Sequence, residues 1–115
     1  MTTEDLRAYG ANVEEGLNRC VNNEAFYLRL VGKVAAEPAF EQLEKAVGDK
    51  ALDEAFEAAH KLKGVLGNLA LTPLYEPVSE MVELLRKRED VDYGAYLETI
   101  TRKRQELQEL IGDQA

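Results

Sequence analysis

The sequence is poor in several residues that mark particular protein classes. It has one cysteine (Cys20), one histidine and no tryptophan in 115 residues. A lone cysteine excludes an internal disulfide and a cysteine-based zinc cluster, and Cys20 is most simply a small buried apolar residue. No apolar run approaches the roughly 18–20 residues that a transmembrane helix needs. The N-terminus is polar and acidic, unlike a signal or transit peptide, so we expect a cytoplasmic protein.

Positive charge is also scarce. The chain has 14 lysines and arginines against 22 aspartates and glutamates, a formal net charge of −8. Nucleic acids and anionic membranes need a basic protein surface, so we expect neither as a partner. The length suits one hydrophobic core, and 45% hydrophobic with 31% charged residues is typical of a globular protein. We therefore expect a single domain over residues 1–115, with its core at about 12–111.

The hydrophobic pattern is helical nearly throughout, with apolar residues three and four apart and no strand signals. Asn12 fits an N-cap for a short first helix. The second helix begins near residue 24, with Phe26 on its apolar stripe, and Pro38 interrupts it. Asp49 is the expected cap of the third helix, which runs to about residue 69. A fourth helix begins between Pro73 and Pro77, and the last covers about 93–111. The predicted fold is all-α: an antiparallel up-down four-helix bundle with a short additional N-terminal helix.

The only histidine, His60, lies on the third predicted helix and is followed by Gly64 and Gly67. Residues four and seven apart share a helix face, and each glycine costs a helix about 0.8–1.0 kcal/mol relative to alanine. The pattern indicates that a bulky group must reach the imidazole, although the glycines could instead permit close helix packing. On a helical wheel, His60 lies about 120° from the apolar face. We expect it to be at least partly exposed.

The residues beside His60 suit phosphoryl chemistry. Lys63 follows one turn later, and between His60 and Tyr75 there are two lysines and no acidic residue. A neutral imidazole is a nucleophile near pH 7, and phosphoryl transfer depends mainly on positioning and charge screening. No nucleotide-binding motif is present, so phosphate would come from another protein. Alternatively, Lys63 only lies along the bundle surface. Glu57 and His60 match one half of a di-iron motif, which fails because it needs a second histidine; we expect no metal site.

The segment His60-x-Leu62-Lys63-Gly64, with Asn68, Leu69 and Leu74 after it, resembles the phosphorylation motif of histidine phosphotransfer (HPt) domains. The general resemblance extends over about residues 12–110. It implies a four-helix bundle in which His60 accepts a phosphoryl group, Lys63 screens its charge and Gly64 leaves steric clearance. It also implies a partner-docking surface that includes the exposed side of the second helix and the residues Phe56, Lys61, Gly67 and Asn68.

The resemblance further implies a phosphocarrier and not an enzyme, with no cofactor of its own. Its partners would be response-regulator receiver domains, which supply Mg²⁺, and a histidine kinase or hybrid kinase; a monomer suffices for this chemistry. The sequence departs from the family at Ala70, usually glycine, at Lys61, usually a small hydroxyl residue, and at Pro38, in a helix that is usually continuous. Two alternatives remain: a helical module that binds a receiver or kinase without carrying phosphate, and the phosphoacceptor domain of a chemotaxis-type kinase.

Overall fold

The computed structural model describes residues 1–112, which form seven α-helices and no β-strand. The helices are α1 (Thr3–Tyr9), α2 (Val13–Arg19), α3 (Glu24–Val34), α4 (Ala39–Gly48), α5 (Leu52–Asn68), α6 (Thr72–Arg86) and α7 (Gly94–Gly112). The all-α prediction is therefore confirmed for this part of the chain. The expected domain ends at residue 115, so its last three residues lie outside the described ones, and the single-domain organisation stays a prediction. No helix within residues 1–112 has both the length and the hydropathy required to cross a bilayer.

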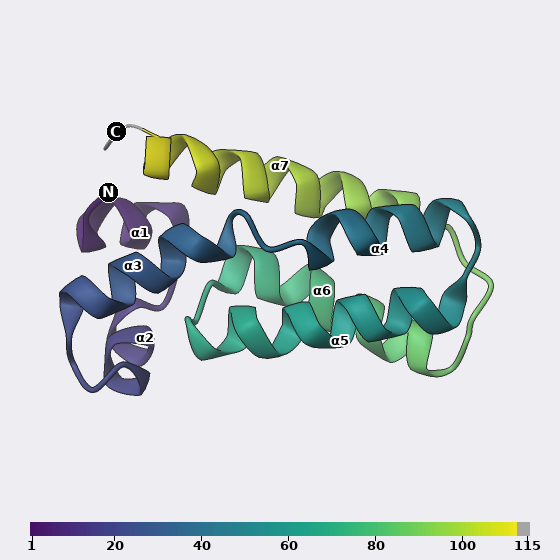
Figure 1. The fold of residues 1–115 in the computed structure, drawn as a ribbon, viewed down its shortest axis with the longest axis horizontal. Coiled ribbons are helices and arrows are strands. Elements are labelled where there is room, and N and C mark those ends of the chain that lie inside the picture. The colour runs from purple at the N-terminus through teal and green to yellow at the C-terminus, as the bar shows by residue number, and fades with distance from the viewer. Residues whose placement is uncertain (113–115) are drawn as a thin grey trace.

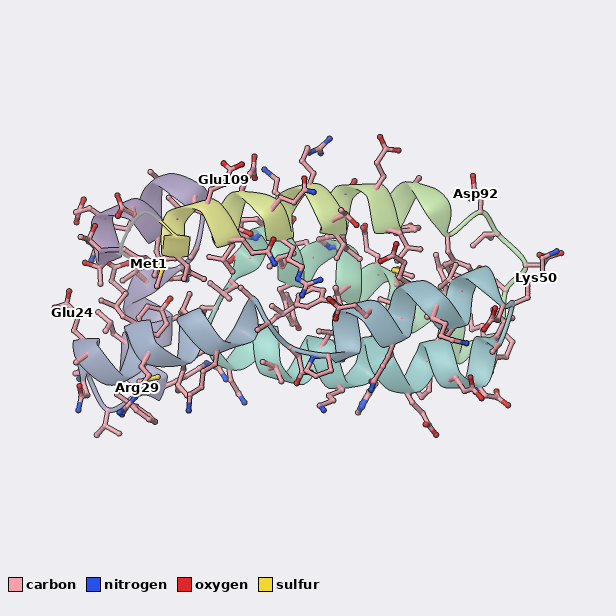
Figure 2. All side chains as sticks on the ribbon, turned by 45° about the horizontal axis from the view of Figure 1, so that its top comes forward. Met1, Glu24, Arg29, Lys50, Asp92 and Glu109 are labelled. Carbon is pink, nitrogen blue, oxygen red and sulfur yellow. The ribbon has the colours of Figure 1, made fainter. Side chains whose placement is uncertain are left out.

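The four helices α4 to α7 pack around one core. Helix α5 contacts α4 and α6, and α6 contacts α7. Figure 1 shows the α4–α5 and α6–α7 connections together at the right end of the molecule, and the α5–α6 connection at the opposite end of α5, toward the N-terminal helices. In Figure 2, Lys50 and Asp92 mark the end that holds the α4–α5 and α6–α7 connections. Helix α5 contributes small and large apolar side chains to this core, and α6 contributes five fully buried ones: Leu74, Val78, Met81, Val82 and Leu85. Burial of this apolar surface is the main stabilising contribution.

The N-terminal end contains two short helices where one was expected. Helix α1 was missed, although Thr2 and Asp5 form a reciprocal capping box at its start. Leu6 anchors it in the core with no exposed surface, and the Tyr9 hydroxyl donates to the Lys103 carbonyl of α7 at 2.8 Å. The predicted cap of the next helix is confirmed, because the Asn12 side chain accepts from the Glu15 amide at 3.2 Å.

Helix α3 buries Val31 and Val34 of its predicted apolar stripe, but a different aromatic residue from the one predicted. Pro38 does separate α3 from α4, as expected. Phe26, however, is 36% exposed, whereas its neighbour Tyr27 is fully buried. The Tyr27 ring lies against Gly16 of α2, where an added Cβ would come within 2.5 Å of the ring. This close approach is available only because Gly16 has no side chain, and it gives Tyr27 the buried place that was predicted for Phe26.

Two predicted helix starts also differ. Asp49 does not cap α5; it ends α4 and pairs with Lys45 at 2.9 Å. The chain needs two more residues to turn, because Lys50 adopts a left-handed φ of 58° that closes the end of α4. Helix α5 then begins at Leu52 without a side-chain cap. Helix α6 begins at Thr72, one residue before the predicted interval, with a proline in its first turn.

Candidate functional site

Helix α5 presents His60 to solvent. Its core-facing residues are fully or nearly fully buried: Ala55, Ala58, Ala59, Leu62 and Leu66. His60 lies outside this face and is exposed, as the helical wheel predicts. Helix α5 packs against both α4 and α6, so the backbone that carries His60 is firmly supported.

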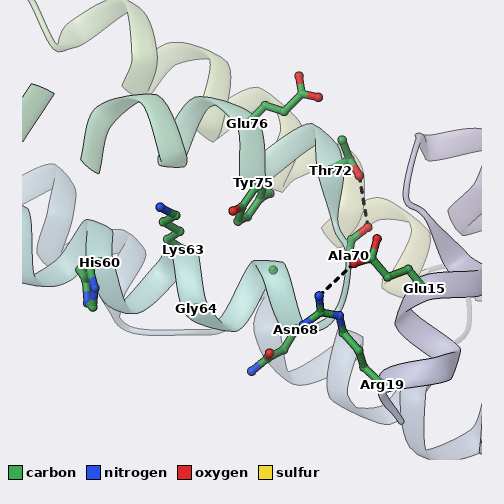
Figure 3. A pocket seen from close by; sticks show the side chains of 11 residues that line it. Glu15, Arg19, His60, Lys63, Gly64, Asn68, Ala70, Thr72, Tyr75 and Glu76 are labelled. Atoms are coloured by element: carbon green, nitrogen blue, oxygen red, sulfur yellow. Dashed lines mark hydrogen bonds and ion pairs between the residues drawn. The ribbon is translucent and has the colours of Figure 1, made fainter. Parts of the chain in front are cut away.

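His60, Lys63 and Gly64 line the same open groove, which has a volume of about 610 Å³. Helix α6 contributes Thr72, Tyr75 and Glu76 to the groove, and the short helix α2 contributes Glu15 and Arg19. Figure 3 shows the groove running from His60 past Lys63 and Gly64 to the α2 residues at the far end. The structure thus brings the predicted phosphorylation residues together, and it adds walls from two helices that the sequence did not connect with His60.

The two glycines near His60 have different surroundings. A Cβ built on Gly64 meets no atom within 4 Å, so this position is open space. A Cβ built on Gly67 would lie 3.1 Å from the Tyr75 ring of α6. Gly67 therefore permits close packing of α5 and α6, which is the alternative that the sequence left open. Its predicted part in partner docking stays a prediction.

The two lysines beside His60 are used differently. Lys61 lies 3.5 Å from the Glu37 carboxylate, at the α3–α4 junction. Lys63 is half-buried and forms no ion pair with any residue of the described chain. Its ammonium group is therefore available to a phosphate that enters the groove. A compact ammonium with three donors suits such a contact.

Phe56, one turn before His60, is the centre of an aromatic and cationic cluster. The centroids of the Phe56 and His60 rings are 5.7 Å apart, and the two ring planes are inclined by 36°. The guanidinium groups of Arg86 and Arg88 lie 5.2 and 5.1 Å from the Phe56 centroid, and Arg88 also pairs with Asp53 at 2.6 Å. Sequence reasoning missed both arginines. Their only signal was the basic run Arg86-Lys87-Arg88 at the end of α6, which local periodicity does not connect with Phe56.

The opposite flank of α5 carries an apolar hollow of about 350 Å³. It lies between α5 and the α3–α4 junction, and its apolar lining residues are Leu30, Val34, Ala36, Pro38, Val65 and Leu69. Asn68 lines both this hollow and the groove beside His60. The exposed Phe26 precedes Leu30 by one turn of α3. The exposed side of the second predicted helix therefore carries apolar residues next to the histidine helix.

The end of α5 is closed by a left-handed residue. Ala70 has φ 54°, and the amides of Ala70 and Leu71 donate to the carbonyls of Gly67 and Leu66, both at 3.1 Å. This pairing is a Schellman motif, which normally places glycine at the left-handed position. The family departure at Ala70 therefore does not move the helix end: the conformation is the one that glycine would adopt.

The same helix end anchors the N-terminal helices. The backbone N–H of Asn12 donates to the backbone carbonyl of Ala70 at 2.9 Å. The Tyr27 hydroxyl donates to the Leu69 carbonyl at 3.0 Å, and burial raises the pKa of Tyr27 to about 12. These bonds fix α2 beside α5 and so determine where Glu15 and Arg19 stand in the groove.

No group of three or more histidine, cysteine, aspartate or glutamate side chains within residues 1–112 is arranged to hold a metal ion.

Comparison with known proteins adds one finding. The model of a family described as the Hpt domain matches residues 33–113. The match contains α4, α5, α6 and α7, and therefore His60, Lys63 and Gly64, whereas α1, α2 and most of α3 precede it. Searches of curated proteins and of solved structures find no match to this chain.

Proposed function

The chain belongs to the Hpt domain family, and on this premise we propose that it relays a phosphoryl group to or from receiver-domain aspartates through a phosphohistidine at His60. The family assignment implies histidine phosphotransfer in two-component signalling. The observation that carries the residue assignment is the exposed His60, which shares one open groove with Lys63 and Gly64. It is the only histidine in the chain.

The proposed step is a direct displacement at phosphorus. A ring nitrogen of the neutral His60 imidazole supplies its lone pair to the phosphorus of a receiver's aspartyl phosphate. The N–P bond forms while the P–O bond to the aspartate breaks, and the aspartate leaves as a carboxylate with the electron pair. The other ring nitrogen keeps its proton. The reverse step passes the phosphoryl group to another receiver, so the protein acts as a carrier and needs no nucleotide site.

The neighbours of His60 have separate roles in this proposal. Lys63 screens the negative charge on the phosphoryl oxygens, because its ammonium lies in the groove without a carboxylate partner among residues 1–112. Gly64 leaves space for the approaching receiver, since even a Cβ atom at this position would have no neighbouring atom within 4 Å. The Mg²⁺ that phosphoryl transfer between such proteins needs would be held by the receiver.

The receiver would dock across α5 and the exposed side of α3. The apolar hollow that contains Leu30 and Val65 shares the lining residue Asn68 with the groove, and burial of apolar surface would supply the binding energy. Lys61 and Phe56 would lie at the rim of this contact. Phe56 would contact the partner by its edge, because Arg86 and Arg88 already lie over its ring.

The remaining assignments follow from the same proposal. We infer that α4 to α7 are the antiparallel up-down bundle of the family, which the order of packing α4–α5–α6–α7 supports. A monomer in the cytoplasm would be sufficient, with a histidine kinase or hybrid kinase as the original source of phosphate.

The test is transfer of radiolabelled phosphate from phosphorylated receiver domains, with Mg²⁺, to the wild-type protein and to His60→Gln. We expect acid-labile, alkali-stable label on the wild type and none on the variant, with unchanged circular dichroism. Equal labelling of the variant would exclude His60. Alternatively, several receivers and a histidine kinase could all leave the wild type unlabelled, while His60→Gln binds its partner as tightly as the wild type does. That result would favour a helical interaction module that carries no phosphate.

A further inference from the structure

The far wall of the groove beside His60 is made by α2, which lies outside the segment that matches the family model. We propose that Glu15 and Arg19 of α2 are specificity-determining residues that contact the loops around the phosphorylated aspartate of the receiver partner. This inference rests on the proposed function, because it takes the occupant of the groove to be the protein that exchanges phosphate with His60. It adds to the docking surface a region that the family motif does not contain.

Helix α2 is short, but its place is determined by contacts with the core. Val13 and Gly16 are buried on its inner face. The Asn12 amide bonds to the Ala70 carbonyl at the end of α5, and the Tyr27 ring lies directly against Gly16. Glu15 and Arg19, on the outer face, are therefore held at a constant distance along the groove from His60.

Glu15 and Arg19 present their charges to solvent and not to the core. They form an ion pair of 2.9 Å, with side chains 48% and 49% exposed, and the Asn12 side chain holds a second Glu15 oxygen at 3.3 Å. Such an exposed pair contributes little to stability. It does place one acidic and one basic group in fixed order at the groove end, a pattern that a partner with the opposite order would match.

The groove connects His60 with the Glu15–Arg19 pair. The groove has a volume of about 610 Å³ and extends from His60 to Arg19. A receiver that delivers phosphate to His60 would bring the loops around its aspartate against this groove, because His60 forms one of its walls. Charges at the rim of an interface affect association rate and partner choice more than stability. Glu15 and Arg19 would therefore act on which receiver binds, and not on the chemistry at His60.

A second feature of the same region supports the inference. Val21 follows α2, has a left-handed φ of 56° and is 87% exposed. A β-branched residue is strained in this conformation, and residues 1–112 leave most of this side chain uncovered. Val21 lies two residues after Arg19 in the chain, and its exposed apolar side chain offers a contact that a protein partner can bury.

The test is isothermal titration of purified receiver domains from the same organism into the wild type and into Glu15→Arg/Arg19→Glu. The double reversal keeps the net charge and one acidic and one basic residue four positions apart, but it exchanges the positions of the two charges. The matched control is Lys45→Asp/Asp49→Lys, which reverses another exposed i,i+4 pair away from the groove. Because reversal can weaken a helix end, Glu15→Gln/Arg19→Gln is measured as well, and circular dichroism checks the helix content of each variant.

We expect the double reversal to weaken binding of the receivers that bind the wild type by about fivefold or more, with an intermediate effect of the neutral variant. The control should stay within about twofold of the wild type. Reversed and neutral variants that both bind every receiver within about twofold of the wild type would overturn the inference. Failure of the proposed function is seen separately, as the absence of label on the wild type, since the binding titration requires no phosphate transfer.

Discussion

The hydroxyl of Tyr27 on α3 donates a 3.0 Å hydrogen bond to the backbone carbonyl of Leu69, the residue that ends the helix carrying His60. The Tyr27 ring occupies the space left by Gly16 on α2. One buried side chain thus connects α2, α3 and the end of α5. The polar wall of the groove beside His60 depends on this connection.

Replacing Tyr27 by phenylalanine should lower the free energy of unfolding by about 1 kcal/mol, because the Leu69 carbonyl loses its buried partner. The pH dependence should change as well. Burial raises the pKa of Tyr27 from its usual 10.0 to about 12, so the folded state favours the neutral phenol. That contribution is fully present below pH 10 and is lost as the pH rises through 12. Urea unfolding of both proteins between pH 8 and 12 measures it. An equally steep alkaline loss in Tyr27→Phe would contradict the assignment.

Ala70→Gly should stabilise the protein by about 0.5–1 kcal/mol. Ala70 holds a left-handed φ of 54° at the end of α5, and a residue with a Cβ is strained there while glycine is not. The greater freedom of glycine in the unfolded chain offsets part of the gain. Thermal unfolding should show a higher Tm with unchanged phosphate transfer. A lower Tm would mean that the buried methyl group contributes more than the strain costs.

Gly64→Leu should leave folding intact and slow phosphate transfer. The new side chain would stand in open space, and loss of a helix-interior glycine should raise the free energy of unfolding by about 0.5–1 kcal/mol. The same side chain would keep the receiver from His60, and we expect a rate lower by about tenfold or more. The matched control is Gly48→Leu at the end of α4, an exposed position that is equally unobstructed. Equal rates in the two variants would remove the clearance role from Gly64.

Lys63→Gln should reduce the transfer rate by about tenfold while unfolding stays within about 0.5 kcal/mol of the wild type. The Lys63 ammonium has no ion-pair partner in the described part of the chain, so its removal breaks no native contact of that kind. Rapid-quench kinetics with one phosphorylated receiver gives the rate, and Lys61→Gln gives a comparison with a lysine that faces Glu37. A normal rate for Lys63→Gln would assign this side chain to the bundle surface alone.

Several elements of the fold and site were predictable from short stretches of chain. The Asn12 cap, the break at Pro38 and the exposure of His60 all agree with the structure. Each depends on residues within one or two helical turns, where spacing, capping and proline geometry act directly. The capping box at Thr2 was equally local, and α1 was missed only because its short pattern has a single buried residue, Leu6.

Other features could not be predicted because they involve residues far apart in the chain. The choice of Tyr27 over Phe26 as the buried aromatic depends on Gly16 in another helix. The packing role of Gly67 depends on Tyr75 of α6. The arginines over Phe56 come from the end of α6 and the turn after it, 30 and 32 residues later in the chain. In each case a helical wheel identifies the face but not the neighbour.

The amino-acid pattern alone is sufficient for an all-α chain with a single exposed histidine, Lys63 one turn later and an open glycine after it, because helix periodicity is a short-range property. Tertiary packing decides what surrounds that histidine. It divides the two flanks of α5 into a polar groove and an apolar hollow, and it brings Glu15 and Arg19 to the groove from a helix more than forty residues earlier. These relations depend on close contacts between helices, and such contacts exist only once the core has formed.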